Sequence, residues 1–223
     1  MQFIEYADAE LMMMTLADTL ASQLRQALSL GERASIAVPG GTTPGPIFDS
    51  LCAVDIDWAR VDIMLTDERW VPEASERSNT RLLRQRLLTN RAAAARLVPL
   101  YADTQTPEES LDILQAGIAA ALPLSVVLLG MGLDMHTASL FPGADRLEDA
   151  LTGTALLVPM RAPGAPEPRV TLSAAVLNGA MSRHIVMTGA AKRAAFERAK
   201  ELPPTEAPVA AVLKGSVIHW AEN

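Results

Sequence analysis

The stretch ILQAGIAAALPLSVVLLGMGL, residues 113–133, carries no charged side chain and is long enough to span a bilayer. Pro123 and several glycines interrupt it. Its first half is rich in alanine and predicts a helix, whereas residues 125–129 are a short apolar run bounded by proline and glycine. Such a run is typical of a parallel strand that is covered on both faces. We therefore expect a helix, a turn and a buried strand here rather than a membrane span.

The same alternation continues along the chain in both directions. The expected helices cover residues 9–28, 46–52, 78–88, 107–122, 171–178 and 190–199, and the expected strands or extended pieces cover 35–38, 61–66, 97–100, 125–129, 156–158 and 184–188. This order predicts βαβ units and therefore an α/β fold with a mostly parallel sheet and helices on both faces. We expect a single domain over residues 1–223, with a loop rich in proline and glycine at 161–168.

Composition excludes several classes of protein. Hydrophobic residues make up 49% of the 223 residues, which is too many for a disordered chain. The 26 acidic residues exceed the 19 basic ones, so general nucleic-acid binding is not expected. The first ten residues lack the basic start of a signal peptide, and the single cysteine cannot form an internal disulfide. We expect a cytoplasmic protein that binds neither nucleic acid nor membrane.

Unusual residues follow four of the expected strands, where ligands bind in open α/β sheets. The first group, Gly40, Gly41, Thr42 and Thr43, offers backbone N–H groups and hydroxyls that suit a phosphate or carboxylate. A tight turn with a threonine cap explains the same residues equally well. The segment has neither the Gly-Lys-Ser/Thr element of a P-loop nor the G-x-G-x-x-G of a dinucleotide site.

The second group, residues 67–69, is Asp-Glu-Arg directly beyond an apolar strand. Three charges at this point are costly to bury unless they are paired, and a carboxylate beside a guanidinium suits a polar ligand. Taken alone, a solvated loop with a surface ion pair is the simpler interpretation.

The third group contains His136 in a glycine-bearing turn, with Asp134 two residues before it. A neutral imidazole can act as a base near neutral pH, and the aspartate could orient it. A histidine that caps the following turn is the alternative. The other two histidines, His184 and His219, are expected to be structural or exposed.

The fourth group is Lys192 near the start of an expected helix, and Arg169 follows the 161–168 loop. A lysine at a helix start is electrostatically unfavourable unless an anion is present, so a phosphate ligand would explain it. The alternative is a lysine that faces solvent. The sequence contains no G-x-S-x-G, no H-E-x-x-H and no cysteine cluster, so neither a serine hydrolase nor a metal site is indicated.

Together these motifs resemble the 6-phosphogluconolactonase family. The segments that carry the resemblance are Pro39–Pro44, Asp67–Arg69 with Ser78–Asn79, Gly130–Asp134, His136–Pro142, Pro168–Thr171, Gly189–Lys192 and Pro208–Leu213. The block His-Thr-Ala-Ser-Leu-Phe-Pro is the most specific of them. The resemblance implies a Rossmann-like αβα sandwich of the kind shared by sugar-phosphate isomerases and deaminases.

The resemblance also implies a reaction, the opening of 6-phosphoglucono-1,5-lactone by water in the oxidative pentose phosphate pathway. His136 would be the general base, Arg69 would stabilise the carbonyl oxygen, and Asp67 and Asp134 would orient substrate hydroxyls, Arg69 or the imidazole. The 6-phosphate would be bound by Gly40, Gly41, Thr42, Thr43, Arg169 and Lys192. No metal or organic cofactor is implied, and a monomer or homodimer is expected.

One residue departs from the family pattern: Met135 stands where the family has glycine. A glycine there indicates positive φ or a close backbone approach, so the turn is either reshaped or strained by methionine. Two alternatives stay open. A glucosamine-6-phosphate deaminase has Ile-Ala-Phe-Asn-Glu-Pro after the central histidine, whereas this chain has Thr-Ala-Ser-Leu-Phe-Pro. A non-catalytic sugar-phosphate sensor is supported only by Met135.

Overall fold

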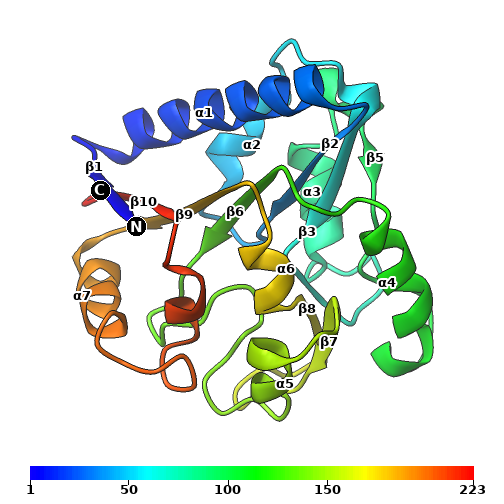
Figure 1. Ribbon diagram of the computed structural model, residues 1–223, viewed down its shortest axis with the longest axis vertical. Helices are drawn as coiled ribbons and strands as arrows, with labels where there is room; N and C mark the ends of the chain where they lie inside the picture. The colour runs from blue at the N-terminus through cyan, green and yellow to red at the C-terminus, as the bar shows by residue number, and fades with distance from the viewer.

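A seven-stranded parallel sheet forms the centre of the molecule (Figure 1), and the computed structural model describes residues 1–223. Its strand order is β1-β10-β9-β6-β2-β3-β5, and every neighbouring pair is parallel. The bounds are β1 Gln2–Glu5, β2 Ala34–Val38, β3 Val61–Leu65, β5 Arg96–Leu97, β6 Val126–Gly130, β9 Ser182–Thr188 and β10 Val217–Ala221. The expected α/β sandwich with a mostly parallel sheet is confirmed.

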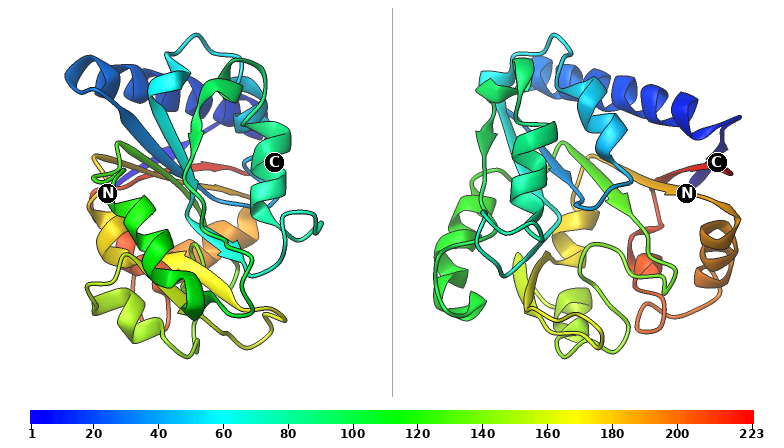
Figure 2. Two further views of the ribbon diagram at one scale, coloured as in Figure 1. Left: turned by 90° about the vertical axis from the view of Figure 1, so that its right-hand side faces the viewer. Right: turned by 180° about the vertical axis from the view of Figure 1, so that it is seen from behind.

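Helices cover both faces of this sheet, as the side view in Figure 2 shows. In Figure 1, α1 and α2 lie above the sheet, and α5, α6 and α7 lie below it. The bounds are α1 Ala9–Leu30, α2 Gly45–Leu51, α3 Asn79–Arg86, α4 Leu111–Ala119, α5 Leu147–Thr152, α6 Ala174–Asn178 and α7 Ala190–Ala199. Because both faces are covered, the strands β2 and β3 are buried along their whole length.

Residues 113–133 contain most of α4, a turn and the strand β6, as predicted. No helix in the structure is both long and apolar enough to cross a membrane. The strand β1 at the N-terminus was not predicted. Its four residues are only partly buried, so they lack the apolar run that marks the central strands.

A second, antiparallel sheet packs beside the main one and corrects two predictions. It has the order β4-β8-β7, with bounds β4 Asp67–Arg69, β7 Leu157–Met160 and β8 Arg169–Leu172. Residues 67–69 are therefore a strand rather than a loop, and the helix expected from residue 171 begins only at Ala174, with Ser173 as its N-cap. These strands are too short to show a sequence period, and distant pairing partners define them.

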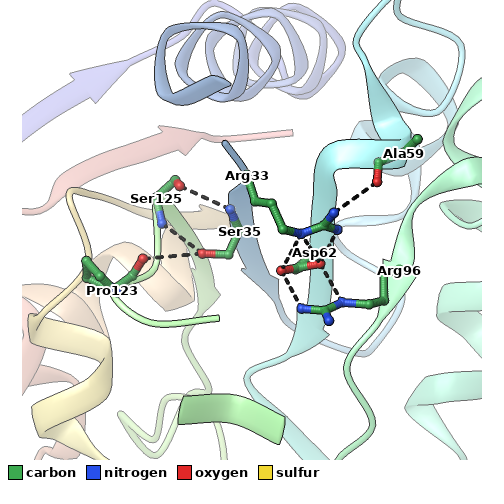
Figure 3. A network of polar contacts seen from close by, with 7 residues as sticks. All are labelled: Arg33, Ser35, Ala59, Asp62, Arg96, Pro123 and Ser125. Carbon is green, nitrogen blue, oxygen red and sulfur yellow. Dashed lines mark hydrogen bonds and ion pairs between the residues drawn. The ribbon is translucent and has the colours of Figure 1, made fainter. Parts of the chain in front are cut away.

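An ion-pair network between one buried carboxylate and two exposed arginines lies at the edge of the sheet that holds the amino ends of β2 and β3 (Figure 3). Asp62 on β3 accepts hydrogen bonds from Arg33 and Arg96. Burial by itself would raise the pKa of Asp62, but the hydrogen bonds from the two arginines outweigh it and lower the pKa. The network therefore stabilises the amino-end edge of the sheet, opposite to the carboxyl-end edge where the loops with the candidate site residues lie.

His184 and His219 are both 2% exposed, so the prediction that they are structural is right and the alternative that they are exposed is wrong. Nδ1 of His184 lies 2.9 Å from Nε2 of His219, whose Nδ1 lies 2.8 Å from the Tyr6 hydroxyl. The Nε2 atom of His184 lies 2.9 Å from Oε1 of Gln23 on α1. Since this amide oxygen only accepts, one directional chain runs from Tyr6 through both neutral imidazoles to Gln23.

Candidate active site

A cavity of about 310 Å³ lies at the carboxyl ends of the parallel strands. The loops that line it follow β9, β6, β2 and β3, which are neighbours in the sheet. The lining residues are Pro39, Gly40, Gly41, Thr42, Thr43, Pro44, Asp67, Arg69, Asn79, Gly130, Met131, Gly132, His136, Ala138, Phe141, Arg169, Val186 and Lys192. The fold thus brings together every candidate residue from the sequence except Asp134, which does not line the cavity but contacts His136.

Asp134 is hydrogen-bonded to the imidazole of His136. Its Oδ1 lies 2.5 Å from Nδ1 of the ring and also accepts from the backbone N–H of His136. The hydrogen bond with His136 lowers the pKa of Asp134, so the carboxylate accepts and the proton lies on Nδ1. Nε2 has no partner in the protein and is free to accept a proton. A Cβ on Gly132 would collide with this pair, so glycine is required there.

Met135, which stands where the family pattern has glycine, lies in the turn that carries His136. Its φ is 66°, so a methionine occupies the left-handed region that favours glycine. Two hydrogen bonds fix it there: Met135 N–H donates to Gly132, and the carbonyl of Met135 accepts from Val209 N–H. The side chain packs at the edge of the hydrophobic core. These hydrogen bonds and this packing therefore keep Met135 in the strained backbone conformation that the sequence indicated.

Asp67 is buried and is held by hydroxyl groups. Its Oδ2 accepts from Ser139 at 2.7 Å and its Oδ1 from Thr66 at 3.2 Å. It pairs with neither Arg69 nor His136, so of the expected roles only contact with a substrate hydroxyl remains. Through Ser139, Asp67 also anchors the segment that follows His136.

Glu68 is the fully buried member of the Asp-Glu-Arg triplet, and the sequence did not mark it out for a role. Its carboxylate accepts from the N–H groups of Arg69, Asn79 and Thr80 and from the hydroxyls of Ser78 and Thr80, at 2.7–3.2 Å. Ser78 is the N-cap of α3, as predicted. This carboxylate joins β4 to the start of α3 and places Arg69 and Asn79 at the cavity.

Arg69 and Arg169 face each other across the β4–β8 ladder, and both line the cavity. The Nε atom of each is buried and has no hydrogen-bond partner. Burial lowers the pKa of Arg169, and the neighbouring charge of Arg69 lowers it further, although a guanidinium keeps its charge in proteins. Two like charges with unused donors on one wall are costly without an anion between them.

The other walls add further unused donors. The N–H groups of Gly40, Gly41, Thr42 and Thr43 donate to no acceptor in the protein. Lys192 is partly buried without a hydrogen bond or ion pair, and burial lowers its pKa. The cavity therefore holds three cations and a row of free N–H groups against one carboxylate, which suits an anionic ligand with hydroxyl groups.

Several lining residues were not among the predicted site residues. Asn79 was quoted only as part of a motif, and its amide donates to the carbonyl of Asp67. The Phe141 ring lies 4.4 Å from the His136 ring and 5.7 Å from the Arg169 guanidinium carbon. No group of three or more His, Cys, Asp or Glu side chains is placed to hold a metal ion.

Comparison with known proteins agrees with this geometry. Residues 7–220 match the family described as glucosamine-6-phosphate isomerases/6-phosphogluconolactonase. The chain belongs to this family. Among its members, a 6-phosphogluconolactonase of Rhizobium meliloti is 41% identical over 92% of both chains, and one of Mesorhizobium japonicum is 40% identical over 97% of this chain and 93% of its own.

Solved structures of the same family share the fold. The crystal structure of a 6-phosphogluconolactonase from Shewanella baltica has a TM-score of 0.96 and 36% identity, covering 99% of this chain and 97% of its own. A monomeric glucosamine-6-phosphate deaminase has a TM-score of 0.81 at 13% identity, which shows the fold alone. The Rossmann-like architecture implied by the resemblance is thus confirmed.

Proposed function

We propose that this protein hydrolyses 6-phosphoglucono-1,5-lactone to 6-phosphogluconate, a step of the oxidative pentose phosphate pathway. Family membership and the 6-phosphogluconolactonase names of relatives at 35–41% identity support this activity. The observation that carries the assignment within this chain is the cross-strand pair Arg69 and Arg169, which sets two cations on one wall of the cavity that contains His136.

The chemistry of the substrate explains why two neighbouring arginines are useful. In the six-membered lactone, the carbonyl carbon C1 and the carbon C5 that bears the phosphorylated arm both bond to the ring oxygen. The carbonyl group and the phosphorylated arm therefore flank the same ring oxygen and lie at one end of the ring. One arginine of a cross-strand pair, Arg69, can donate to the carbonyl oxygen while the other, Arg169, binds the phosphate. Lys192 and the N–H groups of residues 40–43 complete the phosphate site.

His136 acts as the general base in this mechanism. Its free Nε2 takes a proton from water as the water oxygen attacks C1, and Arg69 stabilises the resulting oxyanion. The tetrahedral intermediate then collapses. Its C1–ring oxygen bond breaks, and the ring oxygen leaves with its electron pair and takes up the proton held by His136. The product is a carboxylic acid that ionises, and Asp134 holds the imidazole in the tautomer that the first step needs.

The test is lactone hydrolysis by the purified protein, measured as the rate above spontaneous opening. We expect a rate proportional to enzyme concentration with the phosphorylated lactone and little with unphosphorylated gluconolactone. Ammonia release from glucosamine 6-phosphate is measured in parallel. Ammonia without lactone opening would assign the deaminase activity instead, and tight binding of 6-phosphogluconate with neither reaction would make the protein a sensor.

A further inference from the structure

The carboxylate of Glu167 lies near Arg169 and could form an ion pair with its guanidinium. Glu167 precedes Arg169 by two residues and lies at a bend just before β8, close enough that the charge of each side chain shifts the pKa of the other. The ladder of β4 and β8 continues to this point, because Trp70 N–H donates to the carbonyl of Pro168 at 2.8 Å. The Glu167 side chain is 11% exposed, so it lies against the protein rather than in solvent.

Arg77 holds this carboxylate away from Arg169. Its guanidinium binds both oxygens of Glu167, with Nε–Oε1 at 2.8 Å and Nη2–Oε2 at 3.0 Å. Burial alone would raise the pKa of Glu167, but the hydrogen bonds from Arg77 and the charge of Arg169 lower it. The ionised Glu167 carboxylate is therefore attracted by the charge of Arg169, although only Arg77 donates hydrogen bonds to it.

We infer that Arg77 is a specificity-determining positioning residue: it sequesters Glu167 and so keeps the Arg169 guanidinium free for the phosphate of the substrate. Without Arg77, the released carboxylate has a buried cation as its nearest partner, and an arginine–carboxylate pair would compete directly with phosphate. The backbone carbonyl of Arg77 also accepts from Nη1 of Arg69 at 2.7 Å. Arg77 therefore contacts Arg69 directly and also binds the carboxylate that lies near Arg169. The inference rests on the phosphate site proposed above.

The test compares the ligand affinities of several variants, whose expected ranking differs from the one that a merely structural role of Arg77 would produce. Affinity for 6-phosphogluconate and for gluconate is measured by calorimetry for Arg77→Ala, Glu167→Gln, the double variant and Arg169→Ala. We expect Arg77→Ala to weaken 6-phosphogluconate binding roughly tenfold, because one competing charge-assisted pair must then be broken. Adding Glu167→Gln to it removes the competitor, so the double variant returns to within about threefold of the parent.

A matched control is present at the other end of the same loop. Arg161 forms a similar bidentate pair with Glu108, at 2.7 and 3.2 Å, and lies outside the cavity. Arg161→Ala should leave 6-phosphogluconate affinity unchanged, and gluconate binding should not respond to any change at residues 77 and 167. Thermal unfolding midpoints confirm that each variant is folded.

Two results would overturn the inference. One is parental affinity in Arg77→Ala while Arg169→Ala loses affinity, because the phosphate site then exists without needing Arg77. The other is a double variant as weak as Arg77→Ala, because removing Glu167 would then relieve no competition. If Arg169→Ala itself keeps parental affinity, the proposed phosphate site fails, and this inference fails with it.

Discussion

Oδ1 of Asp134 lies 2.5 Å from Nδ1 of His136, and His136 lines the cavity whereas Asp134 does not. Because an ionised carboxylate only accepts, this contact holds the proton on Nδ1 and leaves the Nε2 lone pair for water. The relationship matters more than either residue alone, because an imidazole without it could present either nitrogen to the substrate. It links the turn geometry of residues 130–136 to the chemistry proposed for the site.

His136→Asn should lower kcat by about 10²- to 10⁴-fold, the usual contribution of a general base. An amide cannot take a proton from water near neutral pH, but it leaves the phosphate contacts intact. Affinity for 6-phosphogluconate should therefore stay near the parental value. Corrected initial rates and calorimetry check both parts, and near-parental rates in a folded variant would return His136 to a structural role.

Lys192→Ala should weaken binding of 6-phosphogluconate by about tenfold or more, since a charge-assisted hydrogen bond contributes roughly 1.5–3 kcal/mol. The free energy of unfolding should hardly change, because the partly buried Lys192 forms no hydrogen bond or ion pair in the protein. Lys214→Ala, on the exposed surface, is the control. Equal losses of affinity for 6-phosphogluconate and gluconate would argue against phosphate binding by Lys192.

Met135→Gly should keep or raise activity, because glycine adopts φ 66° without strain. The released strain, roughly 1–3 kcal/mol, offsets the lost packing of a partly buried side chain. Met135→Ala loses the same packing but keeps a Cβ at positive φ, so it should be less stable than Met135→Gly. Urea unfolding of the two variants gives this difference. A large loss of activity in folded Met135→Gly would assign the methionine a positive role.

Glu68→Gln should lower the free energy of unfolding by about 3 kcal/mol or more, the usual cost of breaking a buried charged network. The new NH₂ group would face donors, and Arg69 and Asn79 would lose their alignment, so KM should also rise. Glu73→Gln breaks an exposed pair with Arg84 and should cost less than about 1 kcal/mol. Similar unfolding midpoints for the two variants would contradict the role of Glu68 as an organising group.

The buried histidines predict acid sensitivity. Burial lowers the pKa of both His184 and His219 from 6.5 to about 4, and for His219 the neighbouring His184 adds to this. The unfolded chain therefore binds more protons than the folded one between these pH values, so stability falls as pH decreases from 6.5 towards 4. We expect a total loss of about 2–4 kcal/mol in unfolding free energy between pH 7.5 and pH 5.

Urea unfolding at the two pH values tests this expectation. His184→Gln removes one of the two groups and should show a smaller loss between pH 7.5 and pH 5. His136→Asn keeps both buried histidines and should show the parental loss. A parent protein whose stability is the same at both pH values would refute the assignment of the acid sensitivity to this pair.

The sequence alone was sufficient for the inner strands of the central sheet, although not for its edge strand β1. Residues 35–38, 61–66 and 125–129 are apolar runs because both faces of a parallel sheet are covered, and this requirement is visible locally. The same reasoning placed four polar groups beyond strand ends, and the carboxyl ends of adjacent strands meet at one edge. The cavity and nearly all of its predicted residues could therefore be located before any coordinates were considered.

Only the tertiary structure decided how these residues act on one another. The pairing of β4 with β8 joins segments a hundred residues apart and sets Arg69 opposite Arg169. Strands of three and four residues are too short for a sequence period to predict such pairing. Neither the burial of Glu68 nor the pair of Glu167 with Arg77 has a local signal. Local sequence determines which residues are buried and where the chain turns. Long-range packing determines the partners of buried charges, because each charge must be neutralised by the groups that the fold places beside it.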